Sequence, residues 1–251
     1  MSRELAIVVG ASGAFGRVIT ARLVAHGLDV LAVGRGGEAL AELAAEIGDN
    51  VEPCAVDLTS DEAVEILRAA IGERVVRAVV HGPGVIVAGG IEDAPVQAIV
   101  TSVDIKVGGL LRLVRAAEGR MVEGSRIIAI AGHYGLEPSH YAATAGIANA
   151  ALFACVRQVS LAYGSRGITA HTLAPGPADT PRLRRVAADR AALHGTTADA
   201  VLDAMREDSS IHAFTTPEQV AWAVTTLLAP EASAMTGSTL MLDSGRRKGL
   251  P

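Results

Sequence analysis

Lysine, cysteine and aromatic residues are scarce in this chain of 251 residues, and long apolar runs are missing. The two cysteines, Cys54 and Cys155, cannot build a disulfide framework and lack the spacing of metal ligands, so we expect no metal site. The longest uncharged run, residues 138–156, contains polar residues such as His140 and Asn149, which favours a packed core helix over a membrane span. Because the N-terminus also lacks a signal-peptide pattern, we expect a soluble cytoplasmic protein.

The charge balance excludes two classes of partner. A formal net charge of −5 and a sequence pI of about 5.8 argue against binding to nucleic acid or to an anionic membrane. Only two lysines occur, Lys106 and Lys248, so a mechanism that needs a lysine has very few candidates.

Short apolar runs alternate with segments of helical period along the whole chain. The predicted strands are residues 5–10, 29–33, 51–56, 78–81, 126–131, 168–173 and 239–242. The predicted helices between them include residues 14–26, 38–47, 61–71, 96–117 and 141–163. Runs that are apolar at nearly every position fit strands covered on both faces. The pattern predicts an α/β fold, a doubly wound (Rossmann-type) seven-stranded parallel sheet, in a single domain over residues 1–251.

One region interrupts this alternation. Residues 181–216 are polar, charged and helix-prone, and two helical stretches, 182–193 and 198–207, flank a plausible turn at His194 and Gly195. An insertion of this length before the last helix predicts a lid over a substrate site.

A glycine-rich loop lies between the first strand and the first helix, and it contains Gly10, Ser12, Gly13, Ala14, Phe15 and Gly16. Glycines there let backbone amides approach a pyrophosphate at the helix N-terminus. The position of this loop between a strand and a helix makes it a strong signal for a bound dinucleotide.

The spacing of this loop resembles the G-x-x-x-G-x-G loop of the short-chain dehydrogenase/reductase family, with Ala14 at the middle glycine. The resemblance implies cofactor contacts at Asp57 and Leu58 near the adenine and at Gly82 and Pro83 after the fourth strand. It also implies contacts at Pro175, Gly176, Ala178 and Thr180, where the family's threonine usually meets the nicotinamide carboxamide. Arg35 follows the second strand, where an arginine accommodates a 2′-phosphate, so we expect NADP as the cofactor, with NADPH preferred over NADH.

The catalytic side of the resemblance is incomplete. Of the family's Asn, Ser, Tyr and Lys, only Tyr141 remains, and Asp104, Gly132 and Ala145 stand at the other positions. Without an ammonium beside it, we expect Tyr141 to stay a neutral phenol, so that Tyr141→Phe costs only on the order of tenfold in rate. His133 follows the fifth strand and is a candidate acid or base. The candidate catalytic residues are therefore Tyr141, Asp104 and His133.

The resemblance implies an atypical NAD(P)H-dependent oxidoreductase of ketoreductase type. A carbonyl beside its own hydroxyl, as in a hydroxyquinone or a polyketide-type compound, would need neither the serine nor the lysine. Two alternatives stay open: a non-redox dehydratase, isomerase or cyclase, and a non-catalytic nucleotide-binding protein. The family commonly pairs its two long helices between subunits, so residues 96–117 and 141–163 predict a homodimer or homotetramer.

Overall fold

The structure is a computed structural model that describes residues 3–85 and 87–249; the ends of the predicted domain, residues 1–2 and 250–251, and residue 86 lie outside the described residues. Seven parallel strands form one sheet in the order β3-β2-β1-β4-β5-β6-β7. The strands are β1 (Leu5–Val9), β2 (Asp29–Gly34), β3 (Val51–Ala55), β4 (Val76–His81), β5 (Met121–Ile130), β6 (Thr169–Pro175) and β7 (Thr239–Leu242). The predicted doubly wound sheet is confirmed.

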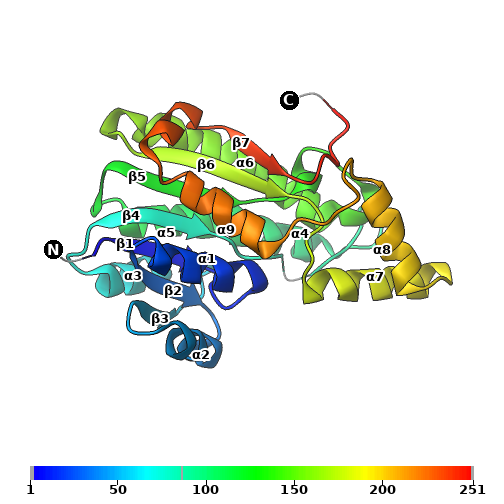
Figure 1. Ribbon diagram of the computed structural model, residues 1–251, viewed down its shortest axis with the longest axis horizontal. Helices are drawn as coiled ribbons and strands as arrows, with labels where there is room; N and C mark the ends of the chain where they lie inside the picture. The colour runs from blue at the N-terminus through cyan, green and yellow to red at the C-terminus, as the bar shows by residue number, and fades with distance from the viewer. Residues whose placement is uncertain (1–2, 86, 250–251) are drawn as a thin grey trace.

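Helices cover both faces of the sheet (Figure 1). They are α1 (Ala14–Ala25), α2 (Gly37–Ile47), α3 (Ala63–Ile71), α4 (Val96–Val103), α5 (Gly109–Ala117), α6 (Ala143–Tyr163), α7 (Pro181–His194), α8 (Ala198–Glu207) and α9 (Pro217–Thr226). The predicted helix over 96–117 is one continuous element whose middle, Asp104–Gly108, winds as a π-helix between α4 and α5. Tyr141 lies just before α6, in a short 3-10 turn over His140–Ala142.

Alternate residues of the central strands pack into two cores. In β1, Leu5, Ile7 and Val9 face one core with Leu110 and Leu152. Ala6 and Val8 face the other core. The continuous apolar pattern of the strands is explained by this two-sided burial.

The carboxyl ends of the strands lie at the end of the sheet where α7 and α8 project (Figure 1). The segment His140–Arg166 has the length and composition of a membrane-crossing helix, but its α6 portion buries residues such as Leu152 and Val156 in the sheet-facing core. Core packing of this helix follows the sequence-based expectation.

Candidate active site

The glycine loop forms a cradle of backbone at the N-terminus of α1. Gly10 has a φ of +80°, and a β-carbon there would lie 3.1 Å from the Gly82 carbonyl oxygen. A β-carbon at Gly16 would lie 2.1 Å from the Gly10 carbonyl oxygen, so α1 can pack on the loop only through glycine. No side chain caps α1 and its first turn holds no acidic residue, which leaves its N–H groups available to an anion.

Arg35 lies beside this cradle, exposed at the end of β2. Among the described residues it has no ion-pair partner, whereas Arg17 on α1 is paired with Glu46 at 2.7 Å. Hydrogen bonds from Thr59, and then the charges of Arg35 and Arg112, hold the pKa of Asp57 below its ordinary value. Asp57 and Arg35 therefore lie at one edge of the site, and Arg35 is the guanidinium there that a phosphate could engage.

Two further turns complete the cofactor side. Gly82 follows β4, and a β-carbon there would lie 3.1 Å from the Ile130 side chain. Gly176 follows β6, and a β-carbon there would lie 2.9 Å from the α-carbon of Asp243. The Thr180 hydroxyl accepts a hydrogen bond from the Leu183 N–H at 3.4 Å and so caps α7. Side chains at Gly82 and Gly176 would approach their neighbours too closely, so the backbone is bare at these two turns.

The remaining predicted cofactor residues lie along the same edge. Leu58 is buried, and its carbonyl accepts a hydrogen bond from Arg112 at 2.9 Å. Pro83 follows Gly82, and Pro175 ends β6. Ala178 forms a single β-bridge with Thr215. The Arg112 bond fixes the backbone after β3, and the bridge fixes the backbone that leads to α7.

Taken together, the cradle fits a dinucleotide. Glycine backbone and an uncapped helix N-terminus supply N–H donors of the kind that a pyrophosphate requires. The described residues contain no group of three or more His, Cys, Asp or Glu side chains arranged to hold a metal ion.

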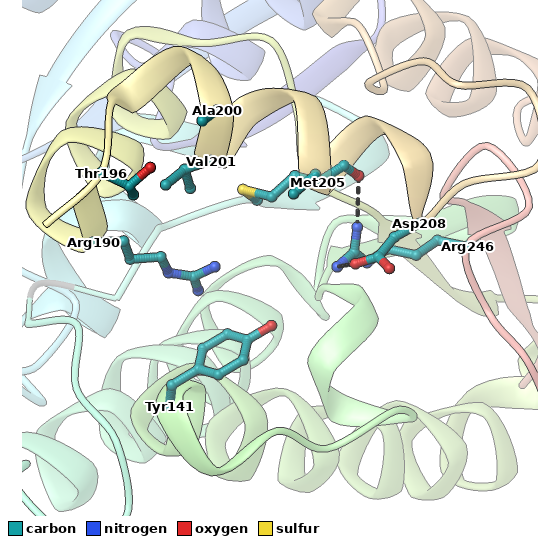
Figure 2. A pocket seen from close by; sticks show the side chains of 9 residues that line it. Tyr141, Arg190, Thr196, Ala200, Val201, Met205, Asp208 and Arg246 are labelled. Atoms are coloured by element: carbon teal, nitrogen blue, oxygen red, sulfur yellow. Dashed lines mark hydrogen bonds and ion pairs between the residues drawn. The ribbon is translucent and has the colours of Figure 1, made fainter. Parts of the chain in front are cut away.

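Tyr141 lies among cations, contrary to the expectation from the sequence. The guanidinium of Arg190 on α7 lies 4.1 Å from the centroid of the Tyr141 ring, and the Tyr134 and Tyr141 hydroxyl oxygens are 3.2 Å apart (Figure 2 shows Arg190 and Tyr141). Burial raises the pKa of Tyr141, but hydrogen bonds from Tyr134 and Ser139 and the charges of Arg190 and Arg246 outweigh it and lower the pKa overall. The expectation of an unassisted phenol is wrong, because residues distant in sequence bring two guanidiniums to it.

The pKa of Tyr134 is shifted in the opposite direction to that of Tyr141. Burial, and then its contact with Tyr141, raise the pKa of the Tyr134 hydroxyl. When Tyr141 ionises, Tyr134 therefore keeps its proton and donates a hydrogen bond to the Tyr141 oxygen.

Asp104 does not join Tyr141. Its carboxylate accepts a hydrogen bond from Arg112 at 2.8 Å, and Arg112 also pairs with Asp61. Lys106, two residues on, is the side chain that turns inward, and its amine donates to the Ile130 carbonyl at 2.8 Å at the end of β5. The Asp104 charge is thereby satisfied by Arg112, and a catalytic role for Asp104 stays a prediction.

Lys106 is buried and has no ion-pair partner among the described residues. Burial, and then the charge of Arg182, lower the pKa of Lys106 to about 7. Beside it, burial and the Lys106 charge lower the pKa of His81 to about 3, so His81 is neutral. The rarity of lysine drew attention to Lys106, but the sequence did not place its side chain among the catalytic candidates.

His133 is buried at the end of β5, and its Nδ1 lies 3.4 Å from Asp243 Oδ2. Burial lowers the pKa of His133, while the bond with Asp243 opposes that change. Asp243 also accepts from the backbone of Gly245 and Arg247. This set ties β5 to the segment after β7, and it gives His133 a structural partner.

The serine position holds Gly132, and a side chain there would meet Asn149. A β-carbon at Gly132 would lie 2.9 Å from Asn149 Nδ2. Asn149 on α6 is buried, so it occupies the space that a side chain at position 132 would need.

The sheet, the glycine cradle and the edge of strand ends define a dinucleotide-binding α/β protein. Residues 10–247 match the family described as Enoyl-(Acyl carrier protein) reductase. The chain therefore belongs to the short-chain dehydrogenases/reductases, which are oxidoreductases, as its sequence resemblance implies.

Individual relatives agree with this assignment. Short-chain dehydrogenase/reductase eriH of Hericium erinaceus is 28% identical over 264 residues, covering 98% of each chain. A putative ketoacyl reductase of Streptomyces coelicolor is 26% identical, covering 96% of each chain. The crystal structure of an actinorhodin polyketide ketoreductase variant with NADPH has a TM-score of 0.88, with 23% identity and 97% of each chain covered, which shows the shared fold.

Proposed function

We propose that this protein is an NADPH-dependent reductase of a small carbonyl compound, of ketoreductase type. The observation that carries the proposal is that the glycine cradle, Arg35 and the Tyr141 hydroxyl lie along one sheet edge. NADPH, when bound, supplies the hydride. The NADPH-bound ketoreductase of the same fold supports the cofactor, and Arg35 supports the 2′-phosphate.

Tyr141 is the proposed proton donor to the substrate oxygen. Its ionised form is stabilised by Arg190 above the ring and by the hydroxyl of Tyr134, so it can release a proton at a lower cost than a free phenol. Positive charge near the phenol oxygen is what the lysine position on α6, here Ala145, would otherwise supply. The guanidinium reaches the same phenol from α7.

Lys106 is a proposed positioning residue. Its amine lies at the ends of β4 and β5, bound to the Ile130 carbonyl two residues before Gly132. An ion buried without an acidic partner costs stability, and a functional requirement explains its retention. His133 is proposed to fix the backbone before Tyr134 through Asp243.

The helical insertion is proposed as a substrate lid. The insertion contains two helices, α7 and α8, and Gly195 between them has a φ of +63° that closes α7. Arg190 extends from α7 over Tyr141 (Figure 2), so closure of the insertion and assistance to the phenol are coupled. Ligand-dependent protection of α7 and α8 from proteolysis tests the lid.

Assembly through α4 and α6 is also proposed. Val96 is 77% exposed and Ile147 is 41% exposed, which leaves apolar surface on both helices. A dimer or tetramer in light scattering supports this assembly, and a monomer at micromolar concentration contradicts it.

The function is tested by fluorescence titration with NADPH and NADH, followed by NADPH consumption with a panel of ketones, quinones and 1,3-dicarbonyl compounds. Saturable NADPH binding and turnover of at least one carbonyl class are expected. Failure to bind NADPH would contradict the proposal; binding without turnover of any compound would favour a sensor or a non-redox enzyme.

A further inference from the structure

A cavity of about 380 Å³ opens beside Tyr141, beneath the helices of the insertion (Figure 2). Its lining combines apolar side chains with three charged ones: Tyr141, Arg190, Thr196, Ala200, Val201, Ala204, Met205, Asp208 and Arg246. This volume lies near the lower end of the roughly 300–1,000 Å³ that is typical of small-molecule sites. The cavity therefore has the size of a small-molecule site.

The charges that line this cavity do not cancel. Arg246 is buried, and its Nη2 pairs with Asp208 at 2.7 Å while its Nη1 donates to the Met205 carbonyl at 2.9 Å. The Asp208 carboxylate is thereby neutralised. Arg190 has no ion-pair partner among the described residues, so it leaves the cavity with one uncompensated positive charge.

The way Arg190 is held favours an anion in a particular place. A guanidinium carries its N–H donors in one plane, where they can bind a planar oxyanion with two hydrogen bonds. The Arg190 guanidinium lies over the Tyr141 ring, 4.1 Å from its centroid, and both residues line the cavity next to the paired hydroxyls of Tyr134 and Tyr141. An anion bound there would hold a neighbouring carbonyl close to the Tyr141 hydroxyl.

We propose that the cavity selects substrates that carry a delocalised oxyanion, which Arg190 binds, with the carbon skeleton against Val201 and Met205. The inference rests on the proposed function, since it names the substrate class of that site. Two sources share this chemistry: a carboxylate, and the ionised hydroxyl of a hydroxyquinone.

The test is calorimetric binding to the NADP⁺-saturated protein and to the cofactor-free protein, which needs no turnover. The probes are benzoate, its neutral counterpart benzamide, and a hydroxynaphthoquinone. Arg190→Gln removes the charge, and Arg184→Gln is the matched control, because Arg184 lies on the same helix, exposed and paired with Asp179 at 3.2 Å. Circular dichroism of both variants checks that the helices persist.

We expect at least one anionic probe to bind about 10- to 100-fold more tightly than benzamide, the range of a charge-assisted hydrogen-bonded pair. Arg190→Gln should abolish this preference, and Arg184→Gln should keep it. If the affinity for the tighter anion is constant from about pH 6 to 8, the preferred group is a carboxylate. If the affinity rises as the quinone hydroxyl ionises, the preferred group is the hydroxyquinone anion.

Equal affinities for charged and neutral probes, an unchanged preference in Arg190→Gln, or no binding of either anion would each overturn the inference. Anion binding without any NADPH binding would instead contradict the proposed function and leave the anion site standing.

Discussion

The guanidinium of Arg190 lies 4.1 Å from the centre of the Tyr141 ring, although the two residues are 49 positions apart and belong to different elements. Arg190 comes from α7 of the helical insertion, and Tyr141 from the turn that precedes α6. The charge beside the phenol is therefore carried by α7 of the insertion, and not by the helix that follows the tyrosine.

Tyr141→Phe should lower kcat for carbonyl reduction by about 10²–10⁴-fold, the usual contribution of general acid–base catalysis. The reason is that Tyr141 has cationic and hydrogen-bonding assistance, so it is more than a positioning hydroxyl. Steady-state kinetics with a substrate found in the carbonyl panel checks this. Tyr163→Phe is the control, since Tyr163 bonds Glu118 near the other end of α6. A loss of tenfold or less at unchanged NADPH affinity would indicate that the substrate supplies its own proton.

Arg35→Ala should weaken NADPH binding by about 10- to 100-fold and leave NADH binding nearly unchanged. The lost interaction is a charge-assisted hydrogen bond to a phosphate, which only NADPH carries. Fluorescence titration with both cofactors measures the two affinities. Arg17→Ala provides the comparison, because Arg17 is already paired with Glu46. If the native protein binds NADPH and NADH with equal affinity, Arg35 does not bind the 2′-phosphate.

Lys106→Met should raise the free energy of unfolding by about 1–4 kcal/mol while it weakens NADPH binding or turnover. The pKa of Lys106 is lowered from 10.5 to about 7, so the unfolded chain binds a proton that the folded chain releases between these values. The buried lysine therefore lowers the free energy of unfolding most below about pH 7, and this effect fades toward pH 10.5. The stability gained by Lys106→Met should show the same dependence on pH.

Denaturant unfolding of both proteins across this pH range measures the difference. A variant that is less stable at every pH, with unchanged cofactor binding, would make Lys106 a purely structural residue.

Gly132→Ser should fail to restore the family's serine and should cost about 1–3 kcal/mol of stability, as overpacking does. The backbone at Gly132 is extended, so the obstacle is Asn149 Nδ2, 2.9 Å from the new β-carbon. Adding Asn149→Ala should relieve most of this cost, which a double-mutant cycle of thermal unfolding detects. Additive losses in the double variant would show that the two positions do not compete for space.

The fold follows from local sequence. The strand–glycine–helix pattern of residues 5–16 and the apolar strands predict the sheet, because those signals act within a few residues of one another. The helix ends of the insertion were also predictable from its turn at Gly195.

The catalytic side could not be predicted in the same way. The tertiary fold brings Tyr141 close to Arg190, Arg246 and Tyr134. The residues next to Tyr141 in the sequence therefore do not predict a nearby cation. Asp104 and Lys106 show the same difficulty. Periodicity shows that both cannot face one side, but the π-helical turn and the pairing with Arg112 decide which one turns inward.

The most direct test of a phenol assisted by Arg190 is a spectrophotometric titration of tyrosine ionisation, which needs no substrate. The chain has three tyrosines, and the pKa of Tyr163 is raised to about 12 while that of Tyr134 is also raised, so Tyr141 should ionise first, below 10.0. That first step should vanish in Tyr141→Phe and move to higher pH in Arg190→Gln, because removing a cation disfavours the phenolate. A first ionisation at or above 10.0, or one unmoved by Arg190→Gln, would contradict the account.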